Sequence, residues 1–161
     1  MSKIDLSIII VNYKCWEVLT RCIESFNKYK PHTSYEIIVV DNNSYDDSTN
    51  IIARDLPEIK LIKNTINMGF SKGVNMGVKH CNASTDSILL LNPDTLVEYN
   101  SIQTLYNSLN DKVGIVGAKL SGEEPKYDIL SKFPSSIAAI ILYSEVASLA
   151  EVESDRVLTS T

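Results

Sequence analysis

Residues 36–44 read EIIVVDNNS, an apolar run that ends abruptly on an acid, two amides and a hydroxyl. Valine and isoleucine are favoured in β-strands, and a run without polar alternation is typical of a strand that is buried on both faces. The segment therefore predicts a buried strand over residues 36–40. The polar residues after it predict a loop at the carboxyl end of that strand.

Similar apolar runs lie before and after this strand. Residues 7–11 read SIIIV, residues 87–91 read SILLL, and shorter runs occupy residues 59–62 and 113–118. Between these strands, apolar residues recur every three or four positions, which is the period of an amphipathic helix. We expect helices over residues 16–30, 46–54, 69–80, 98–109 and 135–151. A polar loop is expected over residues 121–128.

Strands that alternate with helices indicate an α/β fold with a mostly parallel sheet. The length of 161 residues, with 44% hydrophobic and 22% charged residues, is that of one ordinary globular domain. A sheet of this kind binds its ligands at the carboxyl ends of the strands. Functional side chains are therefore expected among the polar residues that follow each strand.

Charge and cysteine usage exclude several classes of function. The net charge of −5 and the lack of a basic stripe exclude a nucleic-acid partner. Cys15, Cys22 and Cys81 are odd in number and lack C-x-x-C spacing, which argues against disulfides and zinc and fits a reducing compartment. His32 and His80 are isolated, so a histidine-based metal site or nucleophile pair lacks support.

The sequence carries no targeting signal that we identify. Its N-terminus lacks a small-residue cleavage site, and the apolar run over residues 137–142 is far shorter than the ~20 residues of a membrane span. A cytoplasmic protein is the resulting prediction.

The turn after the first predicted strand contains no glycine. It reads Asn-Tyr-Lys-Cys at residues 12–15, whereas dinucleotide-binding Rossmann folds, P-loop proteins and nucleotidyltransferases hold phosphates with a glycine-rich loop. A nucleotide at this sheet must therefore be bound in another way. A flavodoxin-like scaffold or response domain is a competing interpretation, which the Asn-Pro-Asp loop and the lack of a lysine site after the fifth strand disfavour.

Asp41, directly after the second strand, has two interpretations. Its carboxylate suits the imide N–H of uracil or thymine, which separates those bases from cytosine, and it equally suits the cap of a turn. Gly69, Gly73 and Gly77 recur every four residues in the helix predicted next, where a glycine costs roughly 1 kcal/mol relative to alanine. Close packing on the sheet explains Gly73 and Gly77, while the start of the helix suits the approach of a ligand.

Asp94 follows the fourth strand in the sequence Leu-Asn-Pro-Asp. Pro93 prevents the strand from continuing and fixes the loop. A rigid carboxylate there suits Mg²⁺ or Mn²⁺ bridging a diphosphate, because Mg²⁺ typically takes one or two protein carboxylates and fills its other sites with phosphate oxygens and water. A turn aspartate without a ligand is the alternative.

Three motifs in this order resemble those of the family 2 glycosyltransferases. They are VDNNSYDDS at residues 40–48, NMGFSKGVNMG at residues 67–77 and LLLNPD at residues 89–94. The likeness is greatest to the bacterial rhamnosyltransferase-type branch, in which N-P-D replaces D-x-D, and SIIIVNY and VGIVGAKL also resemble that branch. The resemblance covers residues 4–135. It implies a GT-A nucleotide-diphospho-sugar transferase fold, Rossmann-like with a mostly parallel sheet, that is truncated at its C-terminal side.

The resemblance also implies roles for individual residues. Val11 and Tyr13 would lie near the nucleobase, Asp41 would bind its imide, and Asn43 would shape the same pocket. Asp94 would bind the metal ion, Mg²⁺ or Mn²⁺. The nucleotide-sugar site would further contain Asn67, Gly69, Phe70, Asn75 and Asn92.

The implied activity is transfer of a sugar, with inversion, from a UDP- or dTDP-sugar donor to a polysaccharide or lipid-linked acceptor. Residues 1–120 would form the nucleotide-sugar-binding part, and residues 121–161 a loop and C-terminal helical segment of the same domain. The family's catalytic base comes from a later segment than this chain contains, so the alternative is a nucleotide-sugar-binding module without a base. Peripheral association with the inner face of the cell membrane and a homodimer through residues 137–142 are further hypotheses.

Overall fold

The computed structural model describes residues 3–110, 113–118 and 139–143. The strands in these ranges are β1 (Leu6–Asn12), β2 (Tyr35–Asp41), β3 (Lys60–Lys63), β4 (Ser87–Leu91), β5 (Ile115–Gly117) and β6 (Ala139–Tyr143). The helices are α1 (Trp16–Lys28), α2 (Ser48–Asp55), α3 (Phe70–Lys79) and α4 (Ser101–Asn107). Every strand and helix predicted before residue 119 is present, with ends that differ by only a few residues.

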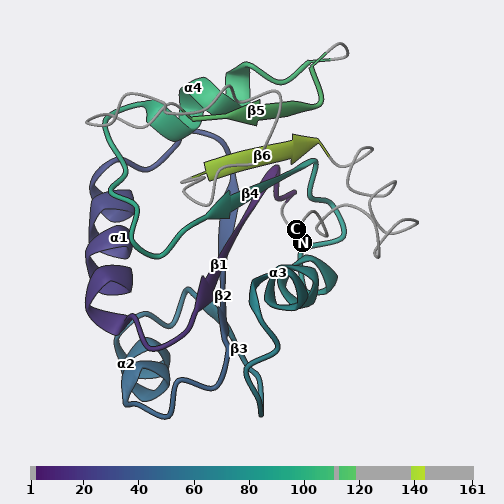
Figure 1. Cartoon of the computed structure of the whole chain (residues 1–161). Coiled ribbons are helices and arrows are strands. Elements are labelled where there is room, and N and C mark those ends of the chain that lie inside the picture. Colours follow the sequence, from purple (N-terminus) through teal and green to yellow (C-terminus); the bar gives the residue numbers. More distant parts are fainter. Residues whose placement is uncertain (1–2, 111–112, 119–138, 144–161) are drawn as a thin grey trace, which may run out of the picture.

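The strands form one sheet in the order β3-β2-β1-β4-β6-β5. β1 pairs in parallel with β2 and β4, β2 pairs in parallel with β3, and β6 runs antiparallel to both of its neighbours. Helices cover both faces, with α1 and α2 on one face and α3 on the other (Figure 1). The prediction of a mostly parallel α/β sheet is confirmed.

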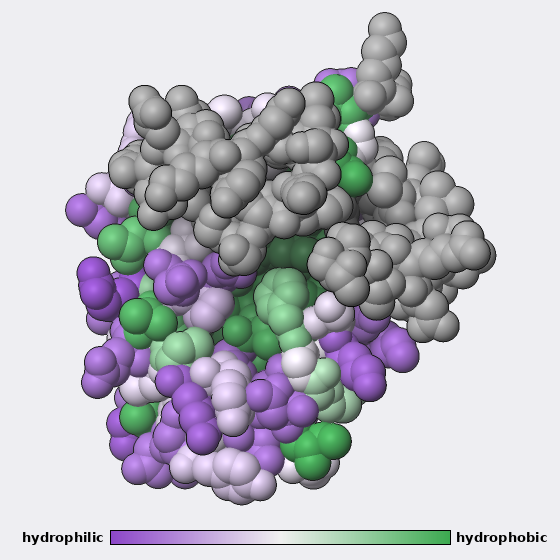
Figure 2. All heavy atoms as spheres, viewed as in Figure 1, coloured by the Kyte–Doolittle hydropathy of each residue, from purple (hydrophilic) through white to green (hydrophobic). Residues whose placement is uncertain are grey.

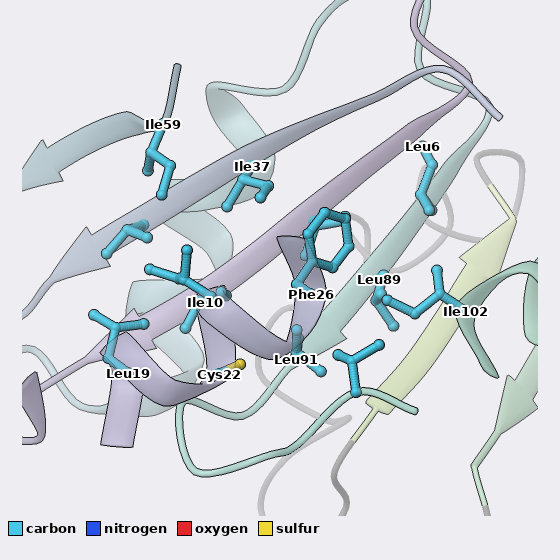
Figure 3. Close-up of a cluster of buried hydrophobic side chains, with 14 of the residues drawn as sticks. Leu6, Ile10, Leu19, Cys22, Phe26, Ile37, Ile59, Leu89, Leu91 and Ile102 are labelled. Carbon is cyan, nitrogen blue, oxygen red and sulfur yellow. The ribbon is translucent and has the colours of Figure 1, made fainter. Parts of the chain in front are cut away.

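Alternate residues of β1 face opposite layers of helices, which explains why the strand is apolar over most of its length. Ile8 and Ile10 belong to the large buried cluster shown in Figure 3, together with Leu19 and Phe26 of α1. Ile9 lies against α3 on the other face. A parallel strand between two helical layers has no solvent-facing side, so alternation of polar and apolar residues is absent.

The helix α3 packs closely on β1 through two glycines. A Cβ atom at Gly77 would lie 2.6 Å from Ile9 Cγ2, and one at Gly73 would lie 2.8 Å from Val11 Cγ1. Non-bonded carbon atoms prefer separations of about 3.5–4.0 Å, so a larger residue at either position would push the helix off the strand. The prediction that these two glycines serve close packing is confirmed.

The helix predicted over residues 135–151 is wrong where the structure describes that segment. Residues 139–143 form β6, which pairs with the full length of β4 and with β5. A short apolar run suits a buried strand as well as a buried helix. The strand is formed here because the backbone groups at the edge of β4 need hydrogen-bond partners. The rest of that segment and the predicted loop over residues 121–128 lie outside the described residues.

The surface of the described part combines polar cover with a few exposed apolar groups. In the view of Figure 2, hydrophilic side chains dominate the lower surface and hydrophobic side chains gather in a hollow beside α3. Among the helices in the described ranges, none is long and apolar enough to cross a lipid bilayer. Large exposed apolar side chains include Tyr13, Tyr45, Ile66 and Phe70, which lie in or directly after the loops that follow β1, β2 and β3.

Candidate functional site

Four strands end at the same edge of the sheet, because β1 to β4 are parallel. We call the loops that follow Asn12, Asp41, Lys63 and Leu91 the carboxyl edge. Asn12, Asp41 and Lys63 are partners in the strand register, so the loops after β1, β2 and β3 start side by side. The carboxyl edge therefore brings together polar residues that are far apart in the sequence.

Asp41 is the buried centre of this edge, with only 3% of its surface exposed. Its Oδ1 accepts hydrogen bonds from Asn12 Nδ2 at 2.8 Å and from Ser44 Oγ at 2.5 Å, and its Oδ2 accepts one from the Ser44 backbone N–H at 3.1 Å. A buried carboxylate is tolerated only when it is hydrogen-bonded in this way. The turn-capping role expected for Asp41 is present, and one acceptor position on Oδ2 is left for a further donor.

Ser44 joins the loops after β1 and β2. Its Oγ accepts hydrogen bonds from Asn12 Nδ2 at 3.1 Å and from the Lys14 backbone N–H at 3.0 Å. Three non-glycine residues in these loops have positive φ angles: Lys14 at 53°, Asn43 at 66° and Tyr45 at 55°. Such conformations are uncommon and persist where surrounding contacts hold them, which is frequent at ligand sites. The hydrogen bonds of Ser44 supply such contacts.

The loop after β2 is also tied to the loop after β3 and to the start of α3. Asn42 Nδ2 donates to the Gly69 carbonyl at 3.0 Å, and Asn64 Nδ2 donates to Asn42 Oδ1 at 2.8 Å. Asn43 Nδ2 donates to the Thr65 carbonyl at 2.8 Å. These amide contacts fix the beginning of α3 relative to the buried carboxylate of the carboxyl edge.

The start of α3 is open toward solvent. Gly69 has a φ of 81°, and a Cβ atom there would meet nothing within 4 Å, so glycine is required for its backbone conformation and not for space. Asn67 Oδ1 accepts the Gly69 N–H at 2.9 Å and stabilises this turn. Phe70 is 52% exposed at the first position of the helix. Asn75 is exposed halfway along α3, and the structure gives its side chain no hydrogen bond to another described residue.

An exposed tyrosine lies at the same edge. Tyr13 follows β1 and is 43% exposed, directly after the buried Val11 and Asn12. The Lys14 ammonium lies 5.3 Å from the centroid of the Tyr13 ring. An accessible aromatic ring beside a cation and a buried acceptor offers stacking area, positive charge and a hydrogen-bond acceptor to one ligand.

Asp94 is exposed in the loop after β4. This loop is held at its start, where the Asn92 carbonyl accepts the Thr95 N–H at 3.1 Å and the Cys22 Sγ–H at 3.7 Å. Burial, and after it the negative charge of Asp94, raise the pKa of the Cys22 thiol to about 12. Asp94 therefore lies close enough to α1 for its charge to act on the Cys22 thiol.

The acids of the carboxyl edge converge on Cys15. Burial raises the pKa of this thiol above its ordinary value, a backbone hydrogen bond to Tyr13 lowers it, and the charges of Asp94, Asp46 and Asp41 raise it further. Asp41 ends β2, and Asp46 and Asp94 lie in the loops after β2 and β4, so the fold places these three carboxylates at one edge of the sheet. Cys15 Sγ also donates to Asn12 Oδ1 at 3.1 Å.

We expect Cys22 to resist alkylation in the folded protein. Because its pKa is raised to about 12, the reactive thiolate is scarce below that pH, and labelling by iodoacetamide at pH 8 should be slower than that of a free cysteine by about 100-fold or more. Mass spectrometry of time points measures the rate, and the guanidinium-unfolded chain is the control. Equal rates in the folded and unfolded protein would contradict the placement of Cys22.

The donor set of the edge fits a divalent cation that arrives with a phosphate ligand. Within the described residues there is no group of three or more histidine, cysteine, aspartate or glutamate side chains that could hold a metal by themselves. One exposed carboxylate, Asp94, lies in a rigid loop. Mg²⁺ commonly binds through one or two carboxylates and completes its shell with phosphate oxygens and water, and Asp94 suits that arrangement.

The prediction from sequence missed the residues that organise the site. Asn12, Asn42 and Ser44 are all at most 3% exposed and bind the predicted site residues, but they were not among the candidates. A signal was available, because an amide at the last position of a buried apolar strand needs a partner. Which partner it finds depends on the neighbouring strand, and sequence order does not give that neighbour.

The chain matches the model of the family described as Glycosyl transferase family 2 over residues 7–133. It is 35% identical over 104 residues to the low-salt glycan biosynthesis hexosyltransferase Agl10 of Haloferax volcanii, which covers 63% of this chain and 32% of that protein. It is 26% identical over 110 residues to the glycosyltransferase GlyG of Streptococcus pneumoniae, covering 66% of this chain and 36% of the relative. The chain thus spans about a third of the length of these curated relatives.

Solved structures share the fold. The mannosyltransferase PcManGT of Pyrobaculum calidifontis, in complex with GDP-Man and Mn²⁺, superposes with a TM-score of 0.75 at 15% identity, over 92% of this chain and 47% of that chain. Residues 1–349 of Staphylococcus aureus TarS, in complex with UDP-GlcNAc, give a TM-score of 0.71 at 16% identity, over 92% of this chain and 48% of that chain. The likeness establishes the GT-A-like fold expected from the motifs. With its family model matched over most of its length, the chain belongs to glycosyl transferase family 2.

Proposed function

We propose that the carboxyl edge binds the nucleotide of a UDP- or dTDP-sugar and that the protein transfers the sugar, with inversion, to a polysaccharide or lipid-linked acceptor. The observation that carries this proposal is the buried Asp41 carboxylate, held by three internal donors with one acceptor position to spare. Family membership and the nucleotide-sugar ligands of the two structural neighbours support it. Rhamnose is the sugar that the N-P-D motif favours.

In this proposal, different residues of the carboxyl edge contact different parts of the sugar-nucleotide. Asp41 accepts the imide N–H of the base, Tyr13 and Val11 contact the base, and Asn43 shapes its pocket by holding the neighbouring loop. The open backbone at Gly69 leaves room for the donor to approach the start of α3. The other residues proposed to line the nucleotide-sugar site are Asn67, Phe70, Asn75 and Asn92.

Asp94 is proposed to hold Mg²⁺ or Mn²⁺ against the diphosphate. A divalent cation there supplies charge neutralisation for the leaving nucleoside diphosphate. The chain's own part is to keep Asp94 in place through the loop that begins at Asn92 and to exclude water around Asp41. A separate carboxylate must take the proton of the acceptor hydroxyl in an inverting transfer, and we assign that role to no described residue.

Cellular placement and assembly are also proposals. We expect the protein to act in the cytoplasm, at the inner face of the membrane where lipid-linked acceptors are exposed, and to form a homodimer. Membrane fractionation tests the first expectation, and light scattering at high protein concentration tests the second. A monomer at every concentration would remove the dimer from the proposal.

Calorimetric titration with UDP, dTDP and GDP, each with and without Mn²⁺, tests the donor site. We expect Mn²⁺ to raise the affinity for UDP or dTDP by about tenfold. Asp94→Ala should remove this gain, because the substitution deletes a charge-assisted contact to the cation. Mn²⁺ alone should bind weakly, because the described residues contain no group of three side chains that could hold it without the diphosphate. The control is Asp47→Ala, which removes another exposed carboxylate from the loop after β2 and should keep the gain from Mn²⁺.

The outcomes separate the alternatives. Failure of every nucleotide to bind would contradict the donor site. Binding that is indifferent to Mn²⁺ and to Asp94→Ala would remove the metal from the proposal and leave the nucleotide. Binding without turnover, when acceptors are added, would favour the nucleotide-sugar-binding module that lacks a base.

A further inference from the structure

The hydrogen bonds around Asp41 have only one consistent set of directions. Ser44 Oγ receives two donors, the Lys14 backbone N–H and Asn12 Nδ2. A serine hydroxyl has a single hydrogen. That hydrogen must therefore point at Asp41 Oδ1, which lies 2.5 Å from the Ser44 oxygen.

The Asn12 amide has a determined orientation as well. Its Oδ1 accepts the Cys15 thiol hydrogen at 3.1 Å, and its Nδ2 faces Asp41 Oδ1 and Ser44 Oγ. The reverse orientation would set the amide oxygen against the carboxylate, acceptor against acceptor. Asn12 is fully buried, so water does not compensate a wrong orientation.

These directions fix the rotation of the Asp41 carboxylate. Two donors occupy its Oδ1, and the Ser44 N–H occupies one position of its Oδ2. What remains is a single acceptor position on Oδ2.

We propose that Asn12 and Ser44 are positioning residues that fix the rotation of the Asp41 carboxylate and keep the unfilled acceptor position of Oδ2 directed at the donor's base, which is thereby selected by hydrogen-bond polarity. The inference rests on the proposed nucleotide site. A base whose ring nitrogen carries a hydrogen, as in uracil, thymine and guanine, satisfies Oδ2. Cytosine and adenine present a ring nitrogen lone pair in the corresponding position and are rejected, because two acceptors face each other in a buried place.

UDP and CDP give the sharpest test, because their bases differ at the ring nitrogen and the neighbouring exocyclic group alone. Calorimetry should show wild-type protein binding UDP more tightly than CDP by about 100-fold or more. Ser44→Ala should lower this UDP-to-CDP ratio by about tenfold or more. The variant loses the hydroxyl donor to Oδ1, so the carboxylate is held less firmly and its Oδ2 is no longer fixed against the base.

Two serine variants make the result specific. Ser44→Thr keeps the hydroxyl and should keep the ratio. Ser7→Ala removes another fully buried serine, which donates to Glu36 Oε1 at 2.6 Å at the opposite end of β1. It should lower stability while leaving the ratio unchanged. Ser44→Cys, with its weaker donor, replaces Ser44→Ala if circular dichroism shows that the alanine variant is unfolded.

Each outcome has a distinct meaning. If the wild-type protein binds neither UDP, dTDP nor GDP, the proposed function fails and the inference with it. If it binds UDP and CDP equally, or if Ser44→Ala weakens both by the same factor, the nucleotide site stands and the positioning role is overturned. The inference is supported if Ser44→Ala lowers the ratio while Ser44→Thr and Ser7→Ala both keep the wild-type ratio.

Discussion

Gly77→Val is expected to destabilise the protein by about 3 kcal/mol or more, and to lower Tm by about 10 °C. A Cβ atom at this position, in the last turn of the helix that packs on β1, would already lie 2.6 Å from Ile9 Cγ2. Valine adds two further methyl groups to that contact. Ile9 is 1% exposed and surrounded by the sheet, so it cannot move aside, and α3 must shift away from β1 instead. Thermal unfolding followed by circular dichroism measures the change.

Gly117→Ala is the matched control for this prediction. A Cβ atom there would meet nothing within 4 Å, so the same change of glycine to a larger residue should alter stability by less than about 1 kcal/mol. A double-mutant cycle with Gly77→Ala and Ile9→Ala adds a second check, since the two changes should destabilise less together than the sum of each alone. Wild-type stability of Gly77→Val would show that α3 does not approach β1 as closely as described.

Asp41→Asn is expected to weaken UDP binding by about 100-fold or more. The asparagine oxygen can keep the Oδ1 contacts to Asn12 and to the Ser44 hydroxyl, but its NH₂ group then replaces Oδ2. That group faces the Ser44 backbone N–H and also presents a hydrogen to the imide N–H of the base. The new NH₂ group therefore faces one hydrogen-bond donor of the protein, the Ser44 N–H, and one of the ligand, the imide N–H. Each buried donor left without an acceptor costs about 1–3 kcal/mol.

Glu36→Gln provides the control for loss of a partly buried, hydrogen-bonded carboxylate on the same strand. Glu36 lies near the amino end of β2, and its Oε1 accepts hydrogen bonds from Ser7 Oγ and from the Asn82 backbone N–H, each at 2.6 Å. The Glu36→Gln substitution should lower the stability of the protein about as much as Asp41→Asn does, while leaving its affinity for UDP unchanged. Equal affinity of Asp41→Asn and wild-type protein for UDP would remove Asp41 from the proposed base pocket.

The distribution of apolar residues was sufficient to predict most of the fold. The runs SIIIV, IIVV and SILLL lack polar alternation, and this pattern is found in strands that carry helices on both faces. The spacing of Gly73 and Gly77 likewise predicted a helix that lies close to the sheet, since only a packing requirement offsets the cost of glycine in a helix. Such features are local, because they depend on the period of one segment.

The same local information failed at β6. An apolar run of five or six residues satisfies both the helical and the extended pattern, and the choice depends on the backbone groups at the edge of β4 that need partners. Residues 139–143 are far from β4 in the sequence. Their pairing is a long-range hydrogen-bonding requirement that no pattern within the segment expresses.

For the site, the sequence by itself determined which residue types follow each strand, and so predicted an acidic, amide-rich carboxyl edge with Asp41 and Asp94 in it. Only the tertiary structure decided which side chains form hydrogen bonds with one another. The register of β1 against β2 sets Asn12 beside Asp41, and the turn after β2 returns Ser44 to both of them. Hydrogen bonds require the partner atoms within about 3 Å of each other in the correct orientation, and that proximity arises from strand pairing between segments separated by about thirty residues in the chain.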